Sequence, residues 1–227
     1  MSSKKIIVAL DSNNLVQTIK LVKILKNEVY AFKIGYEFFF NFGLEGYNKV
    51  YSICPKIFLD LKLHDIPNTV RNGLKALKKI KPLLTTIHIS GGDEMMISSK
   101  TKIKNTKVLG VSILTSLDNK QTKKYYNESN VVSLVKKFTK AAKMNKLDGV
   151  VCSPKEIKHI RNSVGKNFII VTPGIRINKK MISDDQKRVA TPKRAVDMGA
   201  NYLVIGRPIT ESSDPAKAAE ELSNEIQ

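Results

Sequence analysis

Short apolar runs rich in β-branched residues alternate along the chain with longer segments in which apolar residues recur at helical spacing. Each short run is typical of a strand, and each longer segment is typical of an amphipathic helix. The runs predict eight strands, at Ile6–Asp11, Val29–Gly35, Ile57–Lys62, Leu84–Ser90, Val108–Leu114, Gly149–Cys152, Phe168–Thr172 and Tyr202–Gly206. Helices are expected between the strands, and a last helix is expected from about Asp214 to Glu225.

Capping residues and prolines mark where several of these helices should begin. Side chains with a short polar group accept hydrogen bonds from the free N–H groups of a first helical turn, and proline fits the first helical position. Residues of these kinds stand at Asn13, Pro67, Ser153, Thr191 and Asp214.

The regular alternation of strands and helices predicts an α/β protein with a parallel sheet and right-handed crossovers. Eight such units indicate a closed (β/α)8 barrel of the TIM type, as a single domain over residues 1–227. An open doubly wound sheet is the alternative. It is disfavoured because Asp11-Ser12-Asn13 follows the first strand, where a glycine-rich dinucleotide-binding loop would be expected.

Length and composition agree with one globular domain. The chain has 227 residues, of which 42% are hydrophobic, and this is enough to bury a full core. It contains no run of about 18 apolar residues that would predict a membrane span. The first apolar run ends at Asp11 and is too short for a signal peptide, so we expect a cytoplasmic protein. Cys54 and Cys152 have no paired spacing, which indicates reduced thiols and no zinc site.

The formal charge of +19 raises the possibility of a basic nucleic-acid-binding protein. The chain has 33 lysines and 6 arginines, however, and the lysines are scattered over helical segments between apolar residues. No arginine-rich tract or basic stripe with interleaved aromatic residues is present. Solvated helix faces explain this pattern better, and no nucleic-acid partner is expected. The charge should nevertheless attract anionic substrates.

Three predicted strands end with charged side chains on one face. Asp11 ends the first strand, Lys33 lies near the end of the second, and Asp60 and Lys62 end the third. These charges share an inward face because the opposite faces are apolar and should meet the helices. The predicted inward residues are Ile7, Ala9, Val29, Ala31 and Phe58 together with the four charges, and the predicted outward residues are Ile6, Val8, Leu10, Tyr30, Phe32, Ile34, Leu59, Leu61 and Leu63.

Four inward charges at the carboxyl ends of barrel strands indicate an active site. A barrel interior is normally filled by branched apolar side chains, and desolvating each ion costs several kcal/mol, so ion pairs that only plug the barrel explain the pattern less well. Barrels commonly bind phosphate with the loops after strands seven and eight. Here these loops contain Arg176, Gln186, Gly206 and Arg207, and the long segment from Gly174 to about Arg188 is typical of a lid.

The segment Asp60-Leu61-Lys62-Leu63-His64-Asp65-Ile66-Pro67-Asn68-Thr69 closely resembles the signature of the orotidine 5′-phosphate decarboxylase family. The resemblance extends along almost the whole chain, although residues 93–107 are short and 117–131 match no motif. The other matching segments are Ala9-Leu10-Asp11, Phe32-Lys33-Ile34-Gly35, His88-Ile89-Ser90-Gly91-Gly92, Leu114-Thr115-Ser116, Asp148-Gly149-Val150-Val151-Cys152-Ser153, Thr172-Pro173-Gly174-Ile175-Arg176, Asp185-Gln186 and Gly206-Arg207-Pro208-Ile209-Thr210.

The resemblance implies decarboxylation of orotidine 5′-monophosphate to uridine 5′-monophosphate, the last step of de novo pyrimidine nucleotide synthesis, with no cofactor and no metal. It implies that Lys62 stabilises and protonates the C6 carbanion, that Asp60 and Asp65 keep Lys62 charged, and that the family forms a homodimer in which Asp65 and Thr69 reach into the partner's site. The implied substrate-binding residues are Asp11 and Lys33 at the ribose, Thr115 and Ser116 at the pyrimidine, and Arg176, Gln186, Gly206 and Arg207 at the phosphate.

A different function remains an alternative, because the Asp-x-Lys-x-x-Asp motif is shared by a wider group of barrel enzymes. One rival resembles 3-keto-gulonate 6-phosphate decarboxylase, whose group binds magnesium through acidic residues. That group has a glutamate on the second strand where this chain has Lys33, and a lysine would repel a divalent cation. The sequence therefore favours the metal-free decarboxylase over this rival and over the nucleic-acid-binding alternative.

Overall fold

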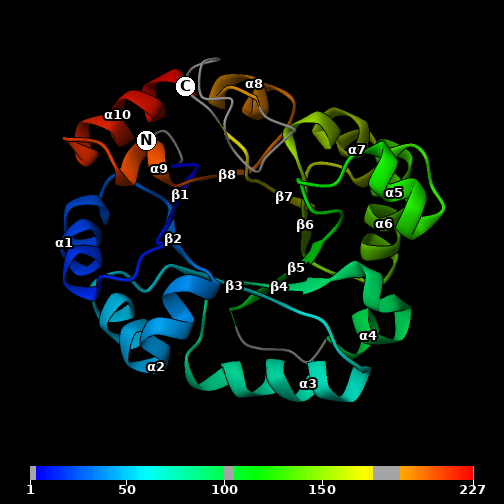
Figure 1. Cartoon of the computed structure of the whole chain (residues 1–227), viewed down its shortest axis with the longest axis horizontal. Helices are drawn as coiled ribbons and strands as arrows, with labels where there is room; N and C mark the ends of the chain where they lie inside the picture. Colours follow the sequence, from blue (N-terminus) through cyan, green and yellow to red (C-terminus); the bar gives the residue numbers. More distant parts are fainter. Residues whose placement is uncertain (1–3, 100–104, 176–189, 227) are drawn as a thin grey trace.

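A computed structural model describes residues 4–99, 105–175 and 190–226. Eight parallel strands close into a barrel in chain order, with β8 paired to β1 (Figure 1). The expected (β/α)8 barrel is therefore confirmed, and the open sheet is excluded. The strands are β1 Ile6–Ala9, β2 Ala31–Ile34, β3 Ile57–Leu63, β4 Leu84–His88, β5 Lys107–Val111, β6 Gly149–Val151, β7 Ile169–Thr172 and β8 Tyr202–Ile205.

Helices form an outer ring around the strands, and α10 at the end of the chain packs against α1 to close that ring (Figure 1). None of the helices described is long and apolar enough to cross a membrane. The helices are α1 Leu15–Leu25, α2 Tyr36–Ile53, α3 Pro67–Ala76, α4 Gly92–Ser98, α5 Asn119–Tyr126, α6 Val131–Met144, α7 Ile157–Val164, α8 Pro192–Asp197, α9 Arg207–Thr210 and α10 Pro215–Glu225, with 3-10 turns η1 Leu77–Lys79, η2 Ile89–Gly91 and η3 Pro154–Glu156.

Four of the five expected helix starts are confirmed. Pro67 is the first residue of α3, and Thr191 and Asp214 are the N-cap residues of α8 and α10. Ser153 is the N-cap residue of η3, and its backbone N–H donates to Glu156 Oε2 at 2.9 Å. The expectation at Asn13 is wrong by one residue. Asn14 is the cap of α1, because its side-chain oxygen accepts a hydrogen bond from the backbone N–H of Gln17 at 3.0 Å.

The expected one-to-one alternation is wrong between β5 and β6, where two helices occur. The additional helix α5 occupies most of the stretch from residue 117 to residue 131 that matches no motif. Asp118 caps it by accepting from the backbone N–H of Gln121 at 3.0 Å. The Asn119 side chain in turn accepts from the backbone N–H of Val131 at 3.0 Å, which ties the start of α5 to the start of α6.

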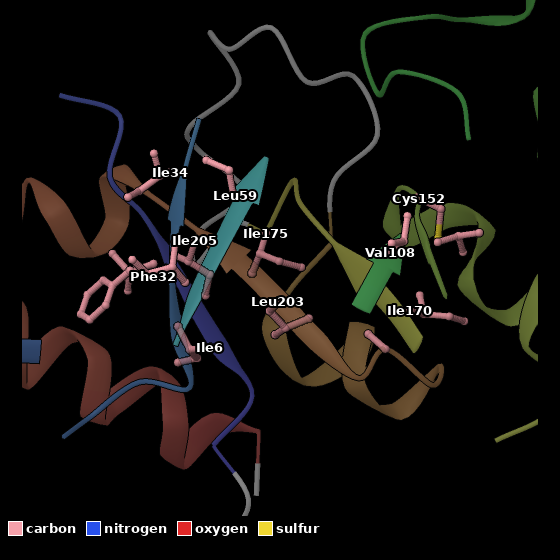
Figure 2. Close-up of a cluster of buried hydrophobic side chains, with 14 of the residues drawn as sticks. Ile6, Phe32, Ile34, Leu59, Val108, Cys152, Ile170, Ile175, Leu203 and Ile205 are labelled. Atoms are coloured by element: carbon pink, nitrogen blue, oxygen red, sulfur yellow. The ribbon is translucent and has the colours of Figure 1, made fainter. Parts of the chain in front are cut away.

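The apolar core has two layers, one inside the barrel and one between the strands and the surrounding helices. The inner layer is small and contains Ile7, Ala31, Phe58, Leu84, Leu109 and Val171. The outer layer joins the opposite strand faces to the helices, and Figure 2 shows part of it, with Ile6, Phe32 and Leu59 on three neighbouring strands. This arrangement confirms the predicted alternation on β1 and β3 and on most of β2.

The prediction of which side chains point into the barrel is wrong for the two residues just before β2. Val29 was expected inside the barrel but belongs to the outer layer, and Tyr30 was expected outside but packs against the inner layer. Both residues precede the first strand residue, Ala31, so the two-residue period does not extend back to them. Tyr30 instead stacks on Tyr202 with ring centroids 4.1 Å apart, at the amino end of the barrel.

Close packing of β6 against β7 generates a stability prediction at Gly149. A Cβ there would overlap the backbone carbonyl of Ile169, which cannot move without disturbing the strand pair. Gly149→Ala should therefore lower the free energy of unfolding by at least about 2 kcal/mol in chemical denaturation.

Gly73 provides the matched control for this measurement. A Cβ at Gly73, inside α3, would meet only Leu63 Cδ1 at an ordinary 3.7 Å. Gly73→Ala should leave the stability unchanged or raise it by about 0.5–1 kcal/mol, because alanine favours a helix interior over glycine. Equal effects of the two substitutions would contradict the packing argument.

Candidate active site

Two ion pairs stand at the carboxyl ends of β1, β2 and β3. Lys33 Nζ lies 3.1 Å from Asp11 Oδ1, and Lys62 Nζ lies 2.9 Å from Asp60 Oδ2. The two lysine side chains are 12% and 26% exposed, so both ammonium groups are partly withdrawn from water. The four charges predicted to be inward thus lie at the expected end of the barrel, paired as two neighbouring couples.

Lys62 reaches its place through an irregular backbone. Its φ is +42°, which few residues other than glycine adopt, and the pairing of β3 with β4 shifts register between Leu59 and Leu63. A residue held in such a conformation costs of order 1–3 kcal/mol, and surrounding contacts must maintain it. Strain of this kind gathers at functional sites, and here it falls on the lysine that the sequence singled out.

Asp60 is the most buried charge of the cluster, with 8% of its surface exposed. Both of its carboxylate oxygens have partners. The Thr86 hydroxyl donates to Oδ1 at 2.9 Å, and the Lys62 ammonium donates to Oδ2 at 2.9 Å. Because each oxygen is satisfied, the carboxylate is held in one orientation beside Lys62.

Three further side chains lie around this pair, namely Thr86, Tyr36 and His88. Of these, the sequence marked only His88, as the first residue of a segment that matches the family. The inward position of Thr86, two residues after the inner-layer Leu84, was an available signal, since polar residues are unusual on that face. Tyr36 begins α2, lies with its ring centroid 5.5 Å from Lys62 Nζ, and donates to the backbone oxygen of Leu61 at 3.2 Å. Nothing in the sequence around Tyr36 indicated this contact.

Burial and charge act on the titrating groups near Lys62. Burial, and then the Asp60 carboxylate, raises the pKa of Tyr36 above its ordinary value, so the phenol stays protonated. Burial, followed by the His64 ring and the Lys62 ammonium, lowers the pKa of His88. The His88 and His64 rings lie 5.1 Å apart. Near Lys62, the shifted pKa values of Tyr36 and His88 thus both favour the neutral form of the side chain.

Asp65 and Thr69 lie beyond β3 and are both exposed. Asp65 Oδ1 accepts from the backbone N–H of Ile66 at 2.7 Å. Among the ion pairs of the described residues, none joins Asp65 to Lys62. The structure of one chain therefore does not bring Asp65 into the cluster that contains Lys62.

The residues expected to contact the base and the phosphate follow other strands. Thr115 and Ser116 lie in the loop after β5, and Gly206 follows β8 and caps α9, whose first residue is the exposed Arg207. These loops open at the same barrel end as the charged cluster, because all eight strands are parallel. Arg176, Gln186 and most of the predicted lid lie outside the described residues.

A cavity of about 470 Å³ lies at the opposite, amino end of the barrel, beside Lys5, Tyr30, Lys56 and Tyr202. It shares no residue with the charged cluster, and active sites of barrels lie at the carboxyl end. In residues 4–99, 105–175 and 190–226, no three His, Cys, Asp or Glu side chains are grouped as a metal ion would require.

The closed barrel, with lysines and aspartates paired at the carboxyl ends of its first three strands, has the architecture of a (β/α)8-barrel enzyme. The sequence profile described as "Orotidine 5'-phosphate decarboxylase / HUMPS family" matches residues 4–222. The chain belongs to this family.

The chain also aligns with individual proteins of this family over nearly their whole lengths. The chain is 45% identical over 217 residues to the orotidine 5′-phosphate decarboxylase of Wolbachia pipientis subsp. Culex pipiens, covering 95% of each chain. It is 42% identical over 223 residues to that of Ehrlichia canis, covering 97% of each. The crystal structure of the Lactobacillus acidophilus orotidine 5′-phosphate decarboxylase is similar with a TM-score of 0.85 and 38% identity, over 99% of this chain and 100% of that one.

Gly35 generates a geometric prediction for the Lys33–Asp11 pair. A Cβ at Gly35 would lie 2.9 Å from Lys33 Nζ and 3.2 Å from Asp11 Oδ1. The lysine end is flexible, so Gly35→Ala should displace the ammonium while the melting temperature changes little. A crystal structure of the variant should show the Nζ–Oδ1 distance beyond the reach of a hydrogen bond. Gly73→Ala should leave this pair unchanged, and an intact pair in Gly35→Ala would contradict the prediction.

Proposed function

We propose that this chain converts orotidine 5′-monophosphate to uridine 5′-monophosphate and CO2, with Lys62 as the group that stabilises the reacting carbon and protonates it. The ion pair of Lys62 with the buried Asp60 carries the proposal, because it fixes an ammonium at the catalytic end of the barrel. Full-length identity of 42–45% to proteins named as this decarboxylase supports the substrate.

The chemistry requires a fixed positive charge. When the bond between C6 and the carboxylate breaks, its electron pair stays on C6, and the pyrimidine ring delocalises that pair poorly. A preorganised ammonium beside C6 stabilises the developing charge and needs no reorganisation of solvent. Lys62 then gives one proton to C6 and recovers one from water. The roles proposed for the lysine are therefore electrostatic stabiliser and general acid.

Asp60 contributes in two ways under this proposal. Its carboxylate holds the Lys62 side chain at 2.9 Å, which orients the ammonium. Because it is only 8% exposed, it also presents a poorly solvated negative charge near the place where the substrate carboxylate would lie. Repulsion between the two carboxylates favours departure of CO2.

We assign the ribose hydroxyls to the Lys33–Asp11 pair. An ammonium offers only donors and a carboxylate offers only acceptors, and a diol needs both. Lys33 already donates to Asp11 at 3.1 Å, so the two groups are oriented before a sugar arrives. Lys33 lies on β2, which pairs with β3, and Asp11 lies two residues beyond the end of β1, so both are next to the proposed reaction centre.

The remaining assignments place the base near Thr115 and Ser116 and the phosphate near Arg176, Gln186, Gly206 and Arg207. Support comes from the loops that follow β7 and β8, which commonly bind phosphate in barrels. Gly206 is the cap of α9, and Arg207 begins that helix with a planar fork of donors suited to a phosphate. We also propose that residues 1–227 form one catalytic domain that acts in the cytoplasm, where nucleotide synthesis supplies the substrate.

The central test is turnover by Lys62→Ala. The substitution removes both the stabilising charge and the proton donor, so the single-turnover rate should fall by several orders of magnitude. Enzymes lower the activation free energy of their reactions by about 8–23 kcal/mol, and Lys62 is proposed to supply much of that reduction here. Loss of pyrimidine absorbance of orotidine 5′-monophosphate measures the rate, and circular dichroism checks the fold. A decrease under roughly tenfold would refute the assignment.

The same assay distinguishes the metal-dependent rival. The wild-type protein should turn over orotidine 5′-monophosphate at an unchanged rate after treatment with EDTA. Activity that EDTA abolishes and magnesium restores would favour the rival over the present proposal.

We further propose a homodimer in which each chain supplies Asp65 to the site of the other. Exposed apolar side chains beside the end of β3 support this arrangement, since Phe40 is 78% exposed, Ile66 is 67% exposed, and Tyr36 stacks on Phe40 with centroids 5.6 Å apart. A second copy would cover this face. Because Tyr36 also touches the Lys62 site, a partner seated there would lie near the reaction centre.

Complementation between two inactive variants tests the shared site. Lys62→Ala and Asp65→Ala should each be nearly inactive alone. In a mixed dimer, one of the two sites contains both Lys62 and Asp65, so random co-assembly should restore about a quarter of wild-type activity. A mixture that stays inactive, although mass spectrometry shows mixed dimers, would place Asp65 in its own chain's site.

A further inference from the structure

Thr86 is a buried polar residue on the inward face of β4. It is 0% exposed and stands two residues beyond Leu84 of the inner apolar layer. Its hydroxyl makes two hydrogen bonds, both to β3. It lies 2.9 Å from Asp60 Oδ1 and 3.0 Å from the backbone nitrogen of Lys62.

The direction of each bond follows from the partners. A carboxylate paired with an ammonium can only accept, and a backbone N–H can only donate. The single hydroxyl proton of Thr86 therefore goes to Asp60, and an oxygen lone pair accepts the N–H of Lys62. One hydroxyl thus joins the side chain of Asp60 to the main chain of Lys62.

Each bond constrains a feature that the reaction would use. The bond to Asp60 Oδ1 fixes the rotation of the carboxylate, so that Oδ2 points to Lys62 Nζ at 2.9 Å. The bond from the Lys62 N–H supports a backbone with φ of +42°, at the place where β3 and β4 lose their regular register. No regular ladder partner is available for Lys62 there, and the threonine replaces it.

We propose that Thr86 is a positioning residue for the decarboxylation, which holds the Asp60 carboxylate and the Lys62 backbone in register. This inference rests on the function proposed above. Thr86 does not touch the reacting atoms under this proposal. Its contribution is the placement of the ammonium and the carboxylate, and errors of about 1 Å in such placement cost roughly 100-fold in rate.

Three variants separate positioning from simple packing. Thr86→Val keeps the shape of the side chain and removes the hydroxyl, whereas Thr86→Ser keeps the hydroxyl and removes the methyl group. Thr85→Val makes the same change one residue earlier, at a buried position (1% exposed) on the other face of β4. Thermal melting and circular dichroism of all three check the fold.

We expect kcat of Thr86→Val to fall by about 10- to 100-fold, because a hydrogen bond to a charged group is lost. KM and the affinity for uridine 5′-monophosphate should change by less than about threefold, since the proposed ribose and phosphate contacts are untouched. Thr86→Ser should retain kcat within about threefold of wild type, and Thr85→Val should retain both constants.

The outcomes are distinguishable. Wild-type kcat in Thr86→Val, or an equal loss in Thr86→Ser, would overturn the positioning role while leaving the proposed decarboxylase intact. If Thr86→Val does not fold, Thr86→Ala replaces it, because alanine and serine both lack the methyl group and differ only in the hydroxyl. A wild-type protein without turnover would overturn both proposals together.

Discussion

The ion pair between Lys62 and Asp60 is the interaction on which the rest of the site depends. A carboxylate that is 8% exposed carries a large desolvation cost, which only a paired charge and hydrogen bonds on both oxygens offset. Lys62 and Thr86 supply these partners from β3 and β4. Lys62 and Thr86 therefore have two effects on the Asp60 carboxylate. They orient it for the proposed chemistry, and they also offset the cost of burying its charge in the barrel.

The barrel achieves this by dividing its interior along the strands. Ile7, Ala31 and Phe58 fill the lower part, and the charged side chains occupy the carboxyl end of the same three strands. β3 departs from regular pairing within the charged region, since its register with β4 shifts between Leu59 and Leu63. The apolar layer lies below the Lys62–Asp60 pair, whose side chains are 26% and 11% exposed, so the attraction between these two charges is stronger than in bulk water.

The eightfold alternation of strands and helices was sufficient to predict the barrel, and the two-residue period of the strands was sufficient to predict the inward position of Lys62, because successive side chains of a strand point to opposite faces. Prediction from this local pattern failed where a side chain is placed by contacts with a segment that is distant in the sequence. Tyr30 turns to the inner layer because Tyr202 lies beside it, and no local pattern contains that pairing. The role of Thr86 depends on the alignment of β4 with β3. The helix Asn119–Tyr126 was missed because few of its residues are buried, so it lacks a clear apolar stripe.

The paired arrangement of the site has a consequence for substrate attraction. Lys33 and Asp11 cancel each other's charge, as do Lys62 and Asp60, so the four charged groups that one chain places at the centre of the site sum to about zero before substrate binds. A nucleotide with a phosphate and a carboxylate is strongly anionic, and neutral pairs do not draw it in. That attraction must come from charges outside the pairs, such as Arg207 and the many lysines behind the net charge of +19. Under the proposed function, the scattered lysines would raise the encounter rate in a way that weakens with salt, while the ion pairs would act on the substrate after it has bound.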